Sequence, residues 1–449
     1  LTLVTGHPGT TFRQQTYAQM RYARDLGIPY RLKSLERQKQ ALQAFAATSP
    51  EARRLAADPI YGIENGQKRL TGQLLGLQKD ANLQKVLEAE KALKAAVAKD
   101  PHMKARAGGS WGAIEQAVAR QTSLLKESSL LDARNSALLG HALTLVRLPQ
   151  ETAKPADQRL PEFAEGSLKA TRARLTNPRP IEKPLDQARL AAGLQEALEE
   201  LGAQHPFVKA LLGGRAPEAV AREAVEGTRL HDLEARKALL EGGAAALAAC
   251  KDPMIALARA LEPFNRRVRQ QVEREVASVF SEHGGRLAEA RFKALGKTQY
   301  PDATFTLRLS YGPVATYPTG SGTKAQPFTT FLGLYDRHLG WGGNTVAAEG
   351  GAWTLPQRWL DRRSRIDLDQ PFNFIYACDT VGGNSGSPVL NTRGEFVGIN
   401  FDSVFEGQGG YYVYDPDTKR SVAVDVRGIL ESLRKVMDAG HLADELTAR

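Results

Sequence analysis

The spacing of hydrophobic residues changes once along the 449-residue chain, near residue 300. Between residues 12 and 296, apolar residues recur every three or four positions, as in Val268, Val272 and Val276, with charged residues between them. That spacing is typical of amphipathic helices, and the stretch is rich in Ala, Leu, Glu, Lys, Arg and Gln, which favour helices. Proline-containing breaks lie at residues 49–50, 100–101, 149–161, 177–180 and 252–253. We therefore expect an all-helical domain over 12–296, built from several helices.

After residue 297 the pattern predicts strands. Phe305, Leu307, Leu309 and Tyr311 alternate with polar residues, which indicates a strand with one buried face. Further strand signals lie at 374–378, 388–390, 395–401 and 411–414, at the valines 422, 424 and 426, and around a hairpin turn at 391–394. A final amphipathic helix follows near residue 429. The fold class that we expect is α+β and multidomain, with a helical domain followed by an antiparallel β-barrel.

The first nine residues, Leu-Thr-Leu-Val-Thr-Gly-His-Pro-Gly, predict a strand that runs into a turn. The chain starts without Met and without a signal peptide. We therefore expect it to begin in the middle of a longer protein.

Composition excludes several classes of partner. The net charge of +10 would suit an anionic partner, but charges of both signs are interspersed along helical stretches such as 84–99, so we expect no nucleic-acid partner. No apolar run approaches the length that crosses a bilayer, so no membrane partner is expected. Cys250 and Cys378 lie far apart without metal-ligand spacing, which excludes a zinc site and leaves one disulfide open. We expect neither a metal nor a cofactor.

The segment Gly-Gly-Asn-Ser-Gly-Ser-Pro at 382–388 carries the candidate chemistry, because it joins two predicted strands. In chymotrypsin-like peptidases such glycines let the chain turn, so that the N–H groups of the serine and of the residue two before it form an oxyanion hole. Ser385 is then the nucleophile, and the donors are the N–H groups of Gly383 and Ser385. The alternative is a glycine-rich hairpin with an incidental serine. Asn384 carries no charge that could capture a new N-terminal ammonium, so activation by that route is not expected.

Several segments resemble the dipeptidyl-peptidase 7/11 type of serine peptidase: Tyr300-Pro301-Asp302-Ala303, the run from Asp379 to Asn391, Phe401-Asp402, and Tyr414-Asp415-Pro416. The resemblance covers nearly the whole chain and is strongest after residue 300. It implies two chymotrypsin-like barrels with a helical domain inserted between them. Residues 1–11 would then be the last strand of a truncated first barrel, 12–296 the helical domain, and 297–449 the second barrel with its C-terminal helix.

The same resemblance carries further expectations. The catalytic His and Asp of such enzymes belong to the first barrel, upstream of this chain, so the chain alone is expected to be inactive. Asp402 would grip the free α-ammonium of the substrate, with help from Asn65. The alternatives are that Asp402 caps a turn and that Asn65 caps a helix starting near Gly66. A homodimer and a periplasmic or secreted location in a Gram-negative bacterium are also implied.

Two residues bear on specificity. In the family, the residue after the ammonium-binding Asp tunes the pocket for the P1 side chain, the one that precedes the cleaved bond. Here it is the uncharged Ser403, which predicts an apolar or broad preference. Asp379, six residues before Ser385, instead suggests a trypsin-like preference for Arg or Lys, unless it anchors the loop.

The leading hypothesis from the sequence is a serine-type dipeptidyl aminopeptidase that releases N-terminal dipeptides from oligopeptides. The alternatives are a trypsin-like endopeptidase, or a non-catalytic helical binding scaffold with a degenerate peptidase module. The helical domain speaks against the endopeptidase, because a cap over the cleft would exclude folded chains. The intact nucleophile loop with Asp402 speaks against the scaffold.

Overall fold

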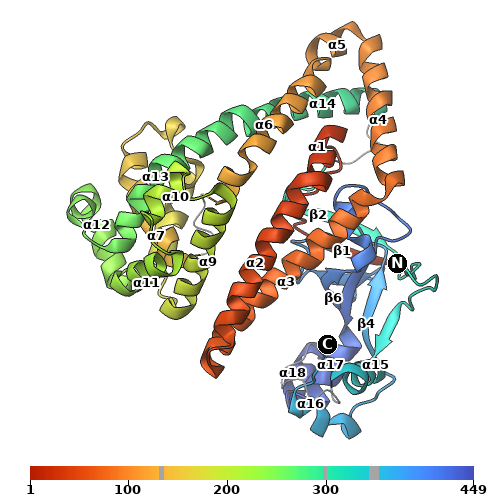
Figure 1. The fold of residues 1–449 in the computed structure, drawn as a ribbon. Helices are drawn as coiled ribbons and strands as arrows, with labels where there is room; N and C mark the ends of the chain where they lie inside the picture. The colour runs from red at the N-terminus through yellow and green to blue at the C-terminus, as the bar shows by residue number, and fades with distance from the viewer. Residues whose placement is uncertain (131–135, 297–300, 343–352, 449) are drawn as a thin grey trace. The chain divides into compact units, whose positions relative to one another are not determined.

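The computed structural model describes residues 1–130, 136–296, 301–342 and 353–448 (Figure 1). The resembling residue Tyr300 lies outside these ranges. The chain divides into two compact units. We call them the sheet unit, formed by Leu1–Gln15, Gly72–Ala89 and Leu295–Arg449, and the helical unit, formed by Thr16–Thr71 and Glu90–Ala294. These ranges do not coincide with the three expected domains, whose bounds stay a prediction.

The described residues between 17 and 295 are mostly helical, as their periodicity predicts. The helices are α1 (Tyr17–Tyr22), α2 (Ile28–Ala46), α3 (Pro50–Gln78), α4 (Asp80–Lys99), α5 (Pro101–Ala107), α6 (Ser110–Leu130), α7 (Ala137–Thr152), α8 (Glu165–Leu175), α9 (Lys183–Leu201), α10 (Pro206–Leu212), α11 (Pro217–Gly227), α12 (Leu233–Ala249), α13 (Pro253–Val272) and α14 (Ser278–Leu295). Pro50, Pro101 and Pro253 each begin a helix, which confirms three predicted breaks. Pro149 instead lies inside α7.

The main core of the helical unit is formed where α7, α9, α10, α11 and α13 pack together. Leu138, Leu145, Ala221 and Ile255 are completely buried there. Val268 is buried in the same core, with Val272 packed against it, so the predicted valine stripe faces the core over this part of its length. Among the described residues, no helix combines the length and the apolar character that crossing a bilayer requires.

The sheet unit is built on one seven-stranded sheet with the order β2-β1-β5-β6-β7-β4-β3, and all of its pairings are antiparallel. The strands are β1 (Thr2–Gly6), β2 (Arg308–Gly312), β3 (Phe328–Thr330), β4 (Pro371–Tyr376), β5 (Pro388–Asn391), β6 (Phe396–Ser403) and β7 (Ser421–Asp425). The predicted hairpin turn joins β5 to β6, and Gly394 supplies the positive φ of 77° that it requires.

The first strand differs from its expected place. We expected residues 1–11 to belong to a separate first barrel, but β1 lies inside this sheet, between β2 and β5. The reason is its register: Leu3 faces Tyr311 on one side and Leu390 on the other, so both edges of β1 are hydrogen-bonded to later strands. An isolated bridge between Val314 and Tyr376 joins the segment after β2 to β4, so the sheet bends back on itself. A closed barrel stays a prediction.

Three other strand predictions need correction. The apolar face of β2 is not buried, since Leu309 and Tyr311 remain 63% and 69% exposed on this edge strand. Residues 411–414 do not form a strand, because the N–H groups of Tyr412 and Val413 both bond to the carbonyl of Gly409 in a helical turn. The last strand does not include Val426, because the side chain of Asp425 accepts the N–H of Arg427 and caps α17, which begins at Val426.

Four helices lie together at one end of the sheet unit: α15 (Phe331–Arg337), α16 (Gln357–Asp361), α17 (Val426–Lys435) and α18 (Gly440–Thr447) (Figure 1). The expected C-terminal helix is therefore present as α17, and α18 follows it. Phe331, Tyr335 and Val436 form a second small core there. Cys250 and Cys378 are both free thiols, so the disulfide left open by the sequence is not formed.

Candidate active site

Ser385 lies in a tight, exposed loop between β4 and β5, as the motif predicts. Its hydroxyl donates a hydrogen bond of 3.2 Å to the carbonyl oxygen of Phe401 on β6. Gly383 has a φ of 109°, and a Cβ added there would overlap the carbonyl oxygen of His7. Glycine is thus required at this position both by backbone conformation and by space.

The two expected oxyanion donors are available. Within the described part of the chain, neither the N–H of Gly383 nor the N–H of Ser385 donates a hydrogen bond to another residue. The neighbouring N–H groups are engaged, since Asn384 N donates to Val381 O at 3.1 Å and Gly386 N donates to Asn400 O at 2.8 Å. Backbone donors in such a loop that lack an acceptor can stabilise an anion.

The loop owes its shape to buried polar side chains. Asn384 is almost completely buried, and its Oδ1 accepts the N–H of Val381 at 3.1 Å. The hydroxyl of Tyr411 accepts the N–H of Gly382 at 2.6 Å. Asn400 Nδ2 donates to the carbonyl of Asn384 at 3.2 Å. Asn384 therefore stabilises the loop through hydrogen bonds and adds no charge to it.

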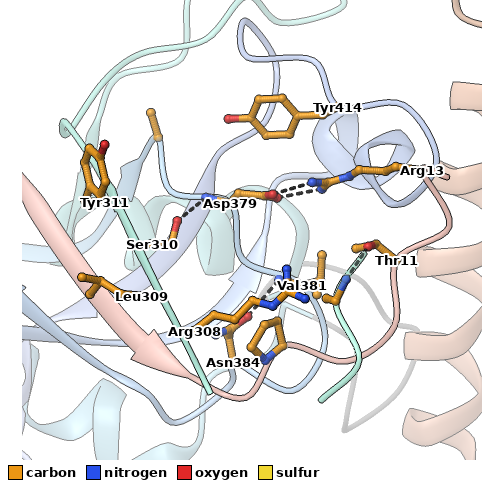
Figure 2. Close-up of a pocket in the computed structure, with 13 residues that line it drawn as sticks. Thr11, Arg13, Arg308, Leu309, Ser310, Tyr311, Asp379, Val381, Asn384 and Tyr414 are labelled. Atoms are coloured by element: carbon orange, nitrogen blue, oxygen red, sulfur yellow. Dashed lines mark hydrogen bonds and ion pairs between the residues drawn. The ribbon is translucent and has the colours of Figure 1, made fainter. Parts of the chain in front are cut away.

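Asp379 starts the loop and is fixed by Arg13, as Figure 2 shows. Arg13 also donates from Nε to the carbonyl of Gly410 at 2.7 Å, and its guanidinium lies 5.1 Å from the ring centre of Tyr414. Arg13, Asp379 and Tyr414 line a cavity of about 590 Å³ that also reaches Leu309 and Tyr311 on β2. The carboxylate of Asp379 is thus committed to an ion pair at the wall of this cavity.

β6 ends beside the nucleophile in a β-bulge. Asn400 pairs with Ala423 of β7 and Asp402 with Val422, which leaves Phe401 as the extra residue. Such a bulge re-aims the residues around it, and here the carbonyl of Phe401 meets Ser385 Oγ. Asp402 is half-buried, and its Oδ1 accepts the N–H of Ser403 at 2.7 Å.

A lysine that the sequence did not single out lies behind Ser403. Lys419 is 1% exposed, and its Nζ lies 3.4 Å from Ser403 Oγ. Burial lowers the pKa of Lys419 to about 8, Arg13 adds to that effect, and the attraction of Asp379 and Asp402 opposes it. A charge-bearing side chain is therefore buried next to the residue that is expected to tune the pocket.

The family model described as Peptidase S46 matches residues 1–448. The chain belongs to the peptidase S46 family. An Asp/Glu-specific dipeptidyl-peptidase from Shewanella putrefaciens is 27% identical over 492 residues, which cover 99% of this S46 chain and 64% of the relative. A dipeptidyl-peptidase 7 from Phocaeicola vulgatus is 34% identical over 147 residues, or 33% of this chain and 20% of the relative.

A solved structure agrees with the fold. The crystal structure of Porphyromonas endodontalis DPP11 in complex with the dipeptide Arg-Glu matches with a TM-score of 0.75 at 21% identity, over 100% of this S46 chain and 64% of that chain. The S46 chain therefore spans slightly less than two thirds of the length of the Shewanella putrefaciens relative and of the Porphyromonas endodontalis protein. The structural match supports the α+β fold.

Three further residues bear on the site, namely Asn65, His7 and His338. Asn65 belongs to the helical unit and lies exposed inside α3, so a helix does not start near Gly66 and Asn65 is not its cap. His7 is exposed near Phe305, whereas His338 is nearly buried and its Nδ1 accepts the N–H of Leu355 at 3.3 Å. Within the described residues of this S46 chain, neither histidine hydrogen-bonds Ser385.

Proposed function

We propose that a longer protein containing this S46 chain is a serine peptidase that releases N-terminal dipeptides from oligopeptides, with Ser385 as its nucleophile. The observation that carries the proposal is the loop at Ser385: an exposed hydroxyl beside two N–H groups, of Gly383 and Ser385, that donate to no described residue. Acyl transfer needs that combination, because the N–H groups stabilise the oxygen anion that forms on attack.

The reaction proceeds in two steps. Ser385 Oγ loses its proton to a general base and bonds to the substrate carbonyl carbon, whose oxygen becomes the anion held by Gly383 N and Ser385 N. The base then gives the proton to the leaving amine, the C–N bond breaks, and an acyl-enzyme remains. Water, deprotonated by the same base, attacks the acyl-enzyme and releases the dipeptide.

The general base is not among the residues that contact Ser385. Among the described residues, the hydroxyl of Ser385 has the carbonyl oxygen of Phe401 as its sole hydrogen-bond partner. We therefore propose that the base and its acid partner, a His and an Asp, come from residues outside the 449-residue chain. A serine without a base is a poor nucleophile at neutral pH, so the chain alone is expected to be inactive.

Asp402 is proposed to select substrates with a free N-terminus. Its half-buried carboxylate follows directly after Phe401, the residue whose carbonyl meets the nucleophile. An ammonium bound there would leave two substrate residues between the N-terminus and the cleaved bond. Asn65 as a second ligand for that ammonium stays a prediction, as do the homodimer and the periplasmic or secreted location.

The P1 preference has two opposing indications. Ser403 is uncharged, which by itself predicts an apolar or broad preference, whereas the name of the Shewanella putrefaciens relative points to Asp or Glu. A preference for basic P1 residues is disfavoured, because Asp379 is paired with Arg13. The same pairing weakens the alternative of a trypsin-like endopeptidase.

The test is active-site labelling combined with product analysis. A fluorophosphonate should label the longer protein at Ser385, mass spectrometry should find dipeptides released from unmodified oligopeptides, and Ser385→Ala should abolish both. The 449-residue chain alone should give no product. A label at another residue, or products longer than dipeptides from the N-terminus, would contradict the proposal.

A further inference from the structure

Lys419 is the most unusual charged residue of the sheet unit, because its ammonium is buried with little compensation. Its one hydrogen bond to a described residue is the 3.4 Å contact with the neutral hydroxyl of Ser403. A lysine ammonium has three donors, and burial of such a group without partners is costly. The site is therefore short of acceptors, which is the condition under which an anionic ligand binds.

Buried hydroxyls join the nucleophile loop to the start of β7, which follows Lys419. Ser421 pairs with Ser403 across the sheet, and its Oγ lies 2.6 Å from the hydroxyl of Thr380 in the loop. Ser421 Oγ also donates to the carbonyl of Cys378 at 2.8 Å. Lys419, two residues before Ser421, thus lies where the nucleophile loop, the end of β6 and the start of β7 meet.

Ser403 lies between Lys419 and the part of β6 that contacts the nucleophile. It lies two residues after Phe401, and at the rise of a strand this is about 7 Å from the carbonyl that meets Ser385 Oγ. Ser403 keeps 8% of its surface exposed and Lys419 keeps 1%, so a ligand reaches the charge through the serine hydroxyl. A hydroxyl that accepts from an ammonium has its own proton left to donate.

The charges near Lys419 leave room for a further anion. Asp379 and Asp402 attract its ammonium and Arg13 repels it. Asp379 is already held by both Nη atoms of Arg13, at 2.5 and 2.8 Å. Asp402 accepts the backbone N–H of Ser403. The hydrogen bond of the ammonium therefore goes to a hydroxyl, whose own proton a substrate carboxylate would accept.

We propose that Lys419 is a specificity-determining residue that makes Asp or Glu the preferred P1 side chain, acting through the hydroxyl of Ser403. In this arrangement Ser403 Oγ accepts a proton from Lys419 Nζ and donates its own to the P1 carboxylate. The inference rests on the proposed function, since it assigns the P1 pocket of the same site. It replaces the apolar preference that Ser403 alone predicts.

The first experiment measures preference as a ratio. In the longer protein, kcat/KM is determined for two dipeptidyl-methylcoumarinamides that share their first residue and carry Glu or Leu at P1. Lys419→Met should lower the Glu-to-Leu ratio about 10- to 100-fold, the usual effect of removing one partner of a close charge pair. Lys435→Met, which removes an exposed lysine at the end of α17, should leave the ratio unchanged. Equal losses for both substrates would assign Lys419 a structural role and overturn the inference.

A second experiment does not depend on turnover. The Ser385→Ala form is titrated calorimetrically with Ala-Glu and with its neutral isostere Ala-Gln. Ala-Glu should bind about 10-fold more tightly, and Ser403→Ala, a small change that keeps the fold if Lys419→Met does not, should reduce the difference. If Lys419→Met cleaves both coumarinamides with the Glu-to-Leu ratio of the unsubstituted protein, the inference is rejected and the proposed function is retained. Absence of any turnover with retained Ala-Glu selectivity rejects the proposed function instead.

The pH profile separates a charge effect from packing. The pKa of Lys419 is lowered to about 8 in the free protein, so its charge is present below that pH and lost above it. The Glu-to-Leu ratio should therefore fall as the pH rises through about 8 and stay flat in Lys419→Met. The other charged groups that act on Lys419 are Asp379, Arg13 and Asp402, and all three remain in Lys419→Met, so their contribution is common to both profiles. A flat profile in the unsubstituted protein would contradict the role of the lysine charge.

Discussion

Arg13 holds the carboxylate of Asp379 through two parallel hydrogen bonds, one from Nη1 to Oδ2 at 2.5 Å and one from Nη2 to Oδ1 at 2.8 Å. The pairing joins the segment after β1 to the start of the nucleophile loop, more than 360 residues later. The side chains are only 15% and 19% exposed. A paired fork of this kind has strong geometric preference, so Asp379 serves the loop as an anchor.

Arg13→Met should therefore loosen the nucleophile loop. We expect a loss of about 2–3 kcal/mol in the free energy of unfolding, because the substitution leaves a largely buried carboxylate without its partner. Fluorophosphonate labelling of Ser385 in the longer protein should slow by about 10-fold, since the N–H donors are no longer held in place. Arg54→Met, in an exposed ion pair with Glu51, is the control. Efficient new cleavage after Arg or Lys would instead identify Asp379 as a specificity acid.

Gly383→Ala tests the oxyanion hole. The residue has a φ of 109°, and a Cβ would overlap His7 O, so alanine must turn the peptide and move its N–H. Loss of one oxyanion donor lowers kcat by about 100- to 1000-fold, and we expect an effect of that size in the longer protein. Gly320→Ala is the matched control, because a Cβ there meets no atom within 4 Å. An active Gly383→Ala protein would show that this N–H does not bind the anion.

Residue types such as proline and glycine predicted where helices and turns lie better than they predicted which side of a strand is buried. Prolines at 50, 101 and 253 begin helices because proline fits the first helical turn, and Gly394 supplies a turn that other residues adopt with strain. Alternation along β2 correctly indicated a strand, but the pattern does not say what covers its apolar face. The place of β1 depends on pairing with residues 308–312 and 389–391, at distances along the chain that periodicity does not encode.

The same limit explains the residue that the sequence analysis missed. The valines 422, 424 and 426 were the strand signal in this segment, but the buried positions of β7 are Ser421, Ala423 and Asp425. Continuing that alternation backwards places Lys419 on the buried side, where the structure has it. The alternation of buried positions with a period of two is present in the sequence, but the buried positions hold Ser421, Ala423 and Asp425, which a search for apolar residues does not detect. Ser385 was found because its loop chemistry is local.

Glu151 carries a pH-dependent part of the stability of the helical unit. Its side chain is fully buried, and burial alone would raise its pKa, but hydrogen bonds from Lys154, the backbone of Leu160 and Arg266 lower it to about 2. A depressed carboxyl pKa stabilises the fold above the unfolded value of 4.5, and this contribution is lost as the pH falls towards 2.

Glu151→Gln should consequently cost about 3 kcal/mol in the free energy of unfolding at pH 7, and the difference from the unsubstituted chain should shrink below pH 4. Urea unfolding of the 449-residue chain across pH 2–7, followed by circular dichroism, measures it. Glu282→Gln removes a carboxylate from an exposed pair with Arg286 and should change stability by less than about 0.5 kcal/mol. Equal effects of the two substitutions would mean that the buried cluster contributes no more than a surface pair.

Asp402 separates an exopeptidase from an endopeptidase more sharply than any other residue of the site. Its carboxylate is half-buried next to the strand end that meets the nucleophile. If it pairs with the substrate ammonium, Asp402→Ala in the longer protein leaves that ammonium without its partner. Transition-state binding of free-amino dipeptidyl substrates should then fall by about 2–5 kcal/mol, the range for truncating one side of a buried charge pair.

Acetylated substrates supply the control for that prediction, because they lack the ammonium and cannot form the pair. They should be poor substrates of the unsubstituted protein and should lose little more on Asp402→Ala. The measurement is kcat/KM for free and N-acetylated dipeptidyl-methylcoumarinamides with both proteins, which forms a double-mutant cycle between Asp402 and the substrate amine. If the acetylated substrates are cleaved as fast as the free ones, Asp402 merely accepts the N–H of Ser403, and the peptidase does not read the N-terminus of its substrate.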